Sequence, residues 1–195
     1  MDENKNESQV NTEKVTKFKK NDKKNNRRPK RTFDKPKSDL EDKVICINRV
    51  TKVVKGGRQF RFSATVVVGN RKGKVGIGTG KAKEMPDAVK KATQSATKNL
   101  VNVELIDNRT ISHEIIVKEG AVRVMLKPAA EGSGVIAGGS VRPVLELAGY
   151  KDIRTKVIGT NNPRNVVYAT IEGLKNMRTI EQVAKKRNKK VDEIM

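Results

Sequence analysis

The segment VGIGTGKAKE, residues 75–84, constrains the fold most strongly, because glycine occupies every second position of what reads as a short strand. A P-loop would need glycine where the chain has Val75, and a hydroxyl side chain where it has Ala82. A dinucleotide fingerprint would need a buried parallel strand before its glycines, whereas this strand is short and follows a basic hairpin. We therefore interpret the glycines as positions where the strand approaches another backbone closely.

The residues around this segment predict a small α+β unit, in which an antiparallel sheet of three strands is followed by one helix. The strands are rich in β-branched residues or alternate between apolar and polar positions, and glycine-containing turns separate them. The helix has small and apolar residues at a spacing of three or four, with Pro86 in its first turn, where proline is tolerated. The predicted elements are strands at 44–54, 60–69 and 74–80, turns at 55–58 and 69–73, and a helix at 84–101.

A second unit of strands and helices is predicted after the first. ISHEIIVK and AVRVMLKP form a hairpin, and the glycine-rich loop EGSGVIAGGS follows, either as a backbone anion site or as a packing surface. Ser140 is placed to cap a short helix that Gly149 ends. DIRTKVIG is a further strand, after which Asn162 opens a helix. Thr179 and Gln182 fit a capping box for a last helix over 180–188.

The N-terminal segment differs from the rest of the chain in composition. It is rich in Lys, Asn, Asp and Glu and has few apolar side chains, so it cannot bury enough surface to offset the entropy lost on ordering. Residues 17–37 alone carry 11 basic and 2 acidic side chains, and two interpretations stay open, an arm with a partner and a solvated tail. The predicted division is 1–43 for a disordered basic arm, 44–108 and 109–178 for two folded domains, and 179–195 for a C-terminal helix and tail.

The charge of the chain favours a polyanionic partner. Its 195 residues include 43 Lys and Arg against 22 Asp and Glu, a formal net charge of +21. Because aromatic residues make up only 3%, contact with phosphates is favoured over stacking on bases. Basic residues gather at the two predicted turns and before the first helix, which favours RNA binding. The candidate RNA-binding residues are Arg49, Lys52, Lys55, Gly56, Gly57, Arg58, Arg61, Arg71, Lys72, Lys74, Lys81, Lys83, Asn162 and Arg164.

No pattern of side chains favours catalysis, a metal or a cofactor. His113, the only histidine, lies in a predicted strand, and the single cysteine, Cys46, excludes an internal disulfide and a four-cysteine zinc site. No segment reaches the roughly 18 apolar residues of a membrane helix, and the N-terminus has no apolar signal core. We expect a cytoplasmic chain that is not an enzyme, has no cofactor, small-molecule substrate or membrane contact, and is not a homo-oligomer. The hypotheses are a structural part of a ribonucleoprotein, a free-standing RNA-binding regulator or chaperone, and a nucleotide enzyme, which would have to bind ATP or NAD.

Long motifs of the chain resemble bacterial small-subunit ribosomal protein five. They are INRVTKVVKGGRQFRFSATVVVGN, GKVGIGTGKAKEMPDAVKKA, LKPAAEGSGVIAGGSVRPVLELAG, GTNNPRNVVYATIEGL and VAKKRNKKVDEI. The resemblance implies a non-enzymatic component of the small ribosomal subunit. It implies an α+β fold, with a domain similar to a double-stranded-RNA-binding module and then a two-layer α/β domain with a four-stranded sheet. It also implies binding to 16S rRNA, contact with small-subunit ribosomal proteins four and eight, a position near the place where mRNA enters, and a contribution to decoding accuracy.

The resemblance also assigns roles to particular segments. It implies that the KGGR hairpin reaches into the rRNA near the spectinomycin site, that the segment 128–142 faces protein four, and that the C-terminal helix faces protein eight. The antibiotic-adjacent residues are Val50, Thr51, Lys52 and Gly57. The residues implied at protein interfaces are Pro128, Glu131, Gly132, Gly134, Gly138, Gly139, Arg142, Val183 and Lys186.

Overall fold

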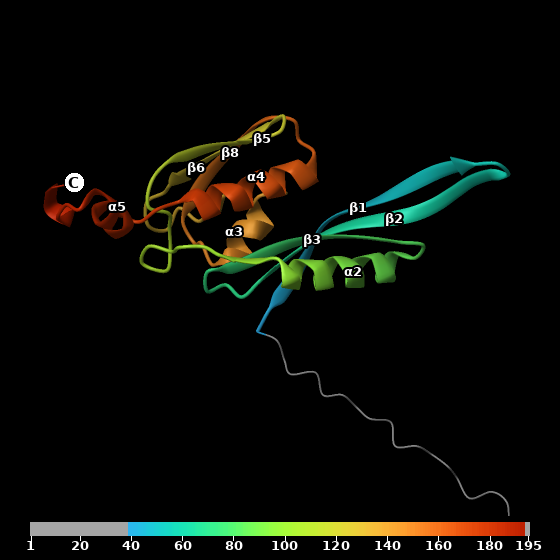
Figure 1. Ribbon diagram of the computed structural model, residues 1–195, viewed down its shortest axis with the longest axis horizontal. Coiled ribbons are helices and arrows are strands. Elements are labelled where there is room, and N and C mark those ends of the chain that lie inside the picture. The colour runs from blue at the N-terminus through green and yellow to red at the C-terminus, as the bar shows by residue number, and fades with distance from the viewer. Residues whose placement is uncertain (1–38, 194–195) are drawn as a thin grey trace, which may run out of the picture. The chain divides into compact units, whose positions relative to one another are not determined.

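The first sheet has four antiparallel strands in the order β1-β2-β3-β4 (Figure 1). The computed structural model describes residues 39–193, so most of the predicted arm, up to residue 38, lies outside the described residues. The predicted meander of three strands is confirmed, and its first strand begins at Glu41 rather than at Val44. The four strands are β1 (Glu41–Val54), β2 (Gly57–Gly69), β3 (Lys74–Ala82) and β4 (Leu100–Asn102).

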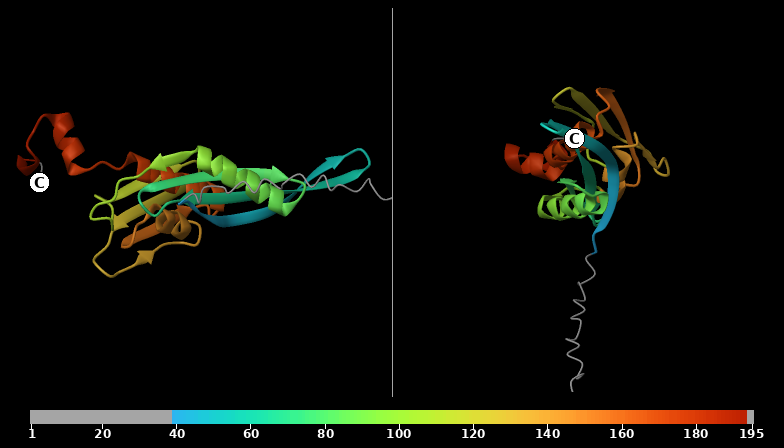
Figure 2. Two further views of the ribbon diagram at one scale, coloured as in Figure 1. Left: turned by 90° about the horizontal axis from the view of Figure 1, so that it is seen from below. Right: turned by 90° about the vertical axis from the view of Figure 1, so that its right-hand side faces the viewer.

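Helix α2 (Met85–Lys98) covers one face of this sheet, as the views in Figure 2 also show. The helix was predicted to continue to residue 101, and that part of the prediction is wrong. Asn99 donates its backbone N–H to Ser95 and Ala96 and closes the last turn, after which β4 pairs with the start of β3. The chain leaves the helix because the free edge of β3 offers backbone partners to the next three residues.

The glycines of β3 bring this strand unusually close to α2. A Cβ atom on Gly78 would collide with backbone atoms of Ala92 and Ala96, and the glycines on either side would collide with the helix in the same way. The helix presents fully buried alanines to this face, so neither element places a bulky side chain between the two backbones. The interpretation of the glycines as positions of close approach is confirmed. The facing residues are Gly76, Gly78 and Gly80 in β3 and Ala88, Ala92 and Ala96 in α2.

The C-terminal half of β2 is buried on both faces. Ala64, Val66 and Val68 pack against α2, as the alternation of the sequence predicts. Val67 points to the opposite face, where it joins a larger core shared with the second sheet and its helices. The first sheet therefore lies between α2 and this larger core.

The second sheet has four strands in the order β5-β6-β8-β7 and is mixed, because β7 runs parallel to β8. The predicted first strand of its hairpin begins at Ile115 instead of Ile111. The chain bends before that point, where Ser112 Oγ donates a hydrogen bond of 3.0 Å to the Arg178 carbonyl oxygen. His113 is exposed in this bend, so its placement in a strand is wrong. The strands are β5 (Ile115–Glu119), β6 (Val122–Pro128), β7 (Val135–Ile136) and β8 (Ile153–Gly159).

Three helices and a short 3-10 turn accompany the second sheet in the described part of the chain. The predicted cap of α3 by Ser140 is wrong: Val141 precedes the helix, and the Gly138 carbonyl accepts hydrogen bonds from the next turn. The predicted end of α3 is confirmed, because Gly149 has a φ of 105°. The elements are α3 (Arg142–Ala148), α4 (Pro163–Asn176), α5 (Ile180–Arg187) and η1 (Val191–Glu193).

The predicted starts of the last two helices are confirmed. Asn162 Oδ1 accepts a hydrogen bond of 3.3 Å from the Arg164 backbone N–H at the start of α4. Thr179 Oγ1 accepts one of 3.4 Å from the Gln182 backbone N–H at the start of α5. Each bond satisfies a backbone donor that has no partner inside its helix. The other half of the predicted capping box is wrong, because the Gln182 side chain donates to Glu104 instead of to the Thr179 backbone.

Candidate nucleic-acid interface

Strands β1 and β2 continue past the rest of the first sheet as a two-stranded ribbon, residues 49–61. β3 pairs with β2 only from Phe62 onward, so the ribbon strands have only each other as ladder partners. Figures 1 and 2 show the ribbon extending beyond the N-terminal end of α2. Its turn has φ angles of 103° at Gly56 and 137° at Gly57, which are strained for any other residue. The KGGR motif therefore specifies the tight turn that holds the ribbon tip.

The ribbon combines positive charge with exposed apolar surface. Val53 is 74% exposed and Phe60 is 45% exposed. The Arg49 guanidinium lies 3.8 Å from the centroid of the Phe60 ring, a cation–π contact that orients both side chains. Such a surface suits phosphates together with the sugars and base faces between them. The basic side chains are Arg49, Lys52, Lys55, Arg58 and Arg61, and the ribbon has no acidic residue.

Two further candidate lysines lie at the base of the ribbon. Lys81 pairs with Ser63 across the β2–β3 ladder, and both Lys81 and Lys83 are exposed. Lys83 lines a shallow hollow of about 290 Å³ together with residues 59–61 of the ribbon. The structure therefore brings these lysines and the ribbon into one basic surface.

The second predicted basic turn lies at the other end of β2. Because β2 has 13 residues, its two ends are roughly 40 Å apart at about 3.3 Å per residue. The turn is docked on α3, since Arg71 and Gly73 donate backbone N–H bonds of 2.8 and 2.9 Å to Leu147 and Ala148. Arg71 also pairs with Glu41 at 2.6 Å. Arg71, Lys72 and Lys74 thus form a separate basic site, and their contact with RNA stays a prediction.

Ion pairs and a hydrogen bond that the sequence does not predict hold the inner side of the glycine-rich loop. Arg109 Nε lies 2.9 Å from Asp152 Oδ2, and the same guanidinium pairs with Glu131. Asp152 is buried and accepts a hydrogen bond of 2.9 Å from the Gly134 backbone N–H. Arg109 and Asp152 carry no local signal, because they are far apart in the sequence and meet only in the folded chain.

The outer surface of this loop is open. A Cβ atom on any of its four glycines would meet no atom within 4 Å, and Arg142 beside them is exposed. Glu131 is also exposed, and Pro128 ends β6 next to the loop. The loop glycines are Gly132, Gly134, Gly138 and Gly139.

The candidates at the start of α4 form another small site. Arg164 lies over the Tyr168 ring at 5.7 Å from its centroid, and Asn162 caps the helix. Arg164 and Tyr168 line a hollow of about 430 Å³ with Glu119 and Gly120 of the β5–β6 turn. This site belongs to the second sheet and is distinct from the ribbon.

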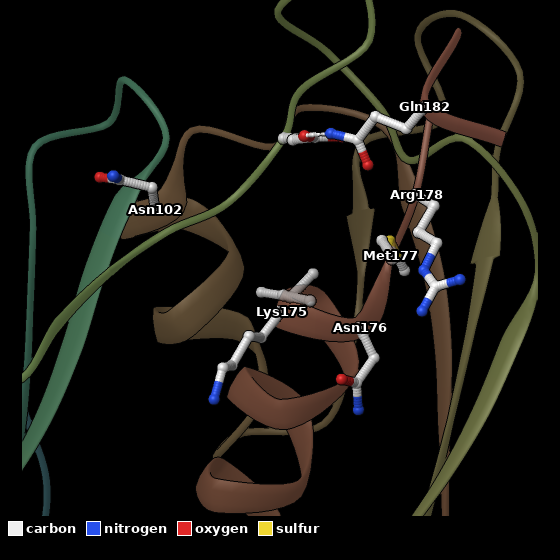
Figure 3. Close-up of a pocket in the computed structure, with 8 residues that line it drawn as sticks. Asn102, Lys175, Asn176, Met177, Arg178 and Gln182 are labelled. Atoms are coloured by element: carbon white, nitrogen blue, oxygen red, sulfur yellow. Dashed lines mark hydrogen bonds between the residues drawn. The ribbon is translucent and has the colours of Figure 1, made fainter. Parts of the chain in front are cut away.

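A polar groove of about 380 Å³ lies where β4, α4 and α5 meet (Figure 3). Its only carboxylate belongs to Glu104, which accepts a hydrogen bond from the Gln182 side chain, so it offers no pair of carboxylates for acid–base catalysis. Nearby, Tyr150 donates a hydrogen bond of 2.7 Å to the Glu104 carbonyl oxygen. Burial and, to a lesser extent, the Glu104 carboxylate raise the pKa of Tyr150 well above its usual range. On α5, Val183 is half-buried and Lys186 exposed.

Within residues 39–193, no group of three His, Cys, Asp or Glu side chains is placed to hold a metal ion. None of the helices in that range is long and apolar enough to span a membrane. A basic ribbon and a second basic turn on an α+β fold are typical of a nucleic-acid-binding protein.

Comparison with known families identifies the family of this chain. Residues 40–104 match the family model of ribosomal protein S5, N-terminal domain, and residues 117–187 match that of ribosomal protein S5, C-terminal domain. The chain belongs to the ribosomal protein S5 family. It is therefore an RNA-binding structural protein of the small ribosomal subunit and not an enzyme, as predicted, and its partners are rRNA and ribosomal proteins.

Proposed function

We propose that the ribbon is the principal contact of this chain with 16S rRNA. The observation that carries the proposal is the set of five basic and no acidic side chains on a two-stranded ribbon that pairs with nothing else in the first sheet. A surface of this kind contacts phosphates without competition from its own carboxylates. Lys81 and Lys83 extend the same surface at the base of the ribbon.

The apolar residues of the ribbon have a complementary role in this proposal. Val53 and Phe60 leave apolar surface exposed that a partner can cover. Double-stranded RNA exposes a wide, shallow minor groove, and unpaired bases expose their faces. We expect these side chains to lie against sugars or bases while the neighbouring cations hold phosphates. In the same proposal, Val50, Thr51, Lys52 and Gly57 lie near the spectinomycin site.

The glycine-rich loop and α5 are proposed as protein contacts. The absence of side chains on four glycines lets a partner backbone approach the loop, and the Arg109–Asp152 network fixes the loop's position. We assign this surface, with Pro128, Glu131 and Arg142, to small-subunit ribosomal protein four. We assign α5, with Val183 and Lys186, to protein eight.

The proposal includes a contribution to decoding accuracy near the place where mRNA enters the subunit. If the contact with protein four opens or closes as the subunit tests a codon, a change at this contact shifts the balance between the two states. Gly138 suits a test better than Gly134, because Gly134 has a φ of 72° and any side chain there is strained.

Incorporation into the small subunit tests the role of the ribbon. The double variant Lys55→Glu with Arg58→Glu reverses two charges at the tip, and Lys91→Glu with Lys98→Glu reverses two exposed charges on α2, to which the proposal assigns no partner. Small subunits assembled with each variant are washed at high salt, and the bound fraction is measured. We expect the ribbon variant to be lost at lower salt than the α2 variant. Equal retention of the two variants contradicts the proposal, and a chain that never sediments with ribosomes would be a free-standing RNA-binding protein.

A further inference from the structure

One face of the second sheet is open. Helix α4 packs against the other face, where Val122, Val124 and Leu126 of β6 are fully buried. The alternate residues of the strands point away from the helix, and Figure 1 shows no described element covering them. We call this surface the open face. It consists of Ile116, Lys118, Arg123, Met125, Lys127, Ile136, Arg154, Lys156 and Ile158.

The open face places like charges directly opposite one another. Lys118 pairs with Arg123 across the β5–β6 ladder, and Lys127 pairs with Arg154 across the β6–β8 ladder. Opposed like charges destabilise a sheet. The charge of Lys127 is partly neutralised by Glu114, because Lys127 Nζ lies 3.0 Å from Glu114 Oε2. The remaining basic side chains of this face make no ion pair with any residue in the range 39–193. The free protein therefore holds an uncompensated positive field here.

A polyanion fits this surface better than the alternatives do. The cores of protein–protein interfaces are depleted in charged residues and in lysine especially, whereas five of the nine side chains here are basic. The N-terminal segment of the same chain is also a poor occupant, because residues 17–37 carry 11 basic and 2 acidic side chains. The face has no aromatic residue, which excludes base stacking as its main contact.

We propose that the open face is a second RNA-binding surface, which contacts phosphates while the ribbon binds elsewhere on the RNA. The proposal deepens the proposed function, since it adds a second contact to the same class of partner. It also accounts for the opposed like charges, because bound phosphates would supply the missing counter-charge.

The test uses the full chain, small-subunit rRNA as the probe, and the double variant Lys118→Gln with Arg123→Gln. We expect its melting temperature to equal or exceed that of the parent, because a repulsive pair is removed. The slope of log affinity against log salt should fall by roughly 1.4–1.8, the value for two lost phosphate contacts. Lys185→Gln with Lys186→Gln removes the same net charge from α5 and should change the slope less.

Each outcome has a defined meaning. A face variant with the slope of its α5 control overturns the proposal, and if the ribbon variant still loses affinity, the proposed function survives. If neither the ribbon nor the face variant loses affinity, both proposals fail. If rRNA binding is unchanged but the assembled subunit loses a neighbouring protein, the occupant is a protein and the proposal is wrong. Lys156 lies opposite Met125, so Lys156→Gln removes no repulsive pair and tests binding alone. We expect this variant to lower the slope of log affinity against log salt by about 0.7–0.9.

Discussion

Replacement of Gly78 by alanine tests the close packing of β3 on α2. The added Cβ would collide with backbone atoms of Ala92 and Ala96, which cannot rotate away as a flexible side chain can. Either the helix or the strand must shift, and the contact of α2 with Ala64, Val66 and Val68 is disturbed. Overpacking of this kind costs about 1–3 kcal/mol. The loss of freedom in the unfolded chain offsets at most about 1 kcal/mol of that cost.

Urea unfolding of the full chain, followed by circular dichroism, measures the net effect. In thermal unfolding of a chain of this size, each kcal/mol of lost stability would lower the melting temperature by roughly 2–4 °C. Gly138→Ala is the matched control, because its Cβ would meet no atom within 4 Å and its φ lies outside the left-handed region. We expect Gly138→Ala to leave stability unchanged or raise it by up to about 1 kcal/mol. Equal stability of the two variants would refute the packing argument.

Three other predictions concern accuracy, the N-terminal segment and pH. Gly138→Arg or Arg142→Leu should change the misreading frequency in a reporter assay with subunit yield preserved, and wild-type misreading in both variants would refute the assignment of the loop. Deletion of residues 1–38 should leave the melting temperature nearly unchanged. The deletion keeps Leu40, which packs against the core, and Glu41, which pairs with Arg71. A large fall in melting temperature would show that the segment contributes to the fold. Because the pKa of Tyr150 is raised in the folded protein, this residue contributes stability that is lost as the pH rises above about 10, where the unfolded chain ionises. Tyr150→Phe should therefore weaken the alkaline fall in unfolding free energy, and an identical pH dependence in the parent and the variant would contradict the burial argument.

Local patterns in the sequence predict most of the secondary structure. The alternation in β2, the glycines of β3 and the caps Asn162 and Thr179 act over a few residues, so their consequences can be inferred without a fold. The start of β4 could not be inferred in this way. Leu100 continues the apolar stripe of the helix, and only the free edge of β3 favours a strand there.

Only part of the candidate site can be predicted from local sequence patterns. The KGGR turn and the basic residues on either side of it predict the ribbon. The docking of the second basic turn on α3 and the support of the glycine-rich loop depend on contacts between distant segments, such as Arg71 with Leu147 and Arg109 with Asp152. The number of basic residues therefore does not distinguish the two predicted basic turns. The KGGR turn projects freely, whereas the turn at residues 69–73 is packed against α3.

The most direct test of the account is the salt dependence of rRNA binding by the ribbon. Affinity of the full chain for 16S rRNA is measured between about 50 and 200 mM salt, for the parent, for Lys55→Gln with Arg58→Gln, and for Lys185→Gln with Lys186→Gln. If the ribbon holds phosphates, the first variant should lower the log–log slope by roughly 1.4–1.8, and the second should change it much less. A ribbon variant with the parental slope and affinity would contradict the central claim.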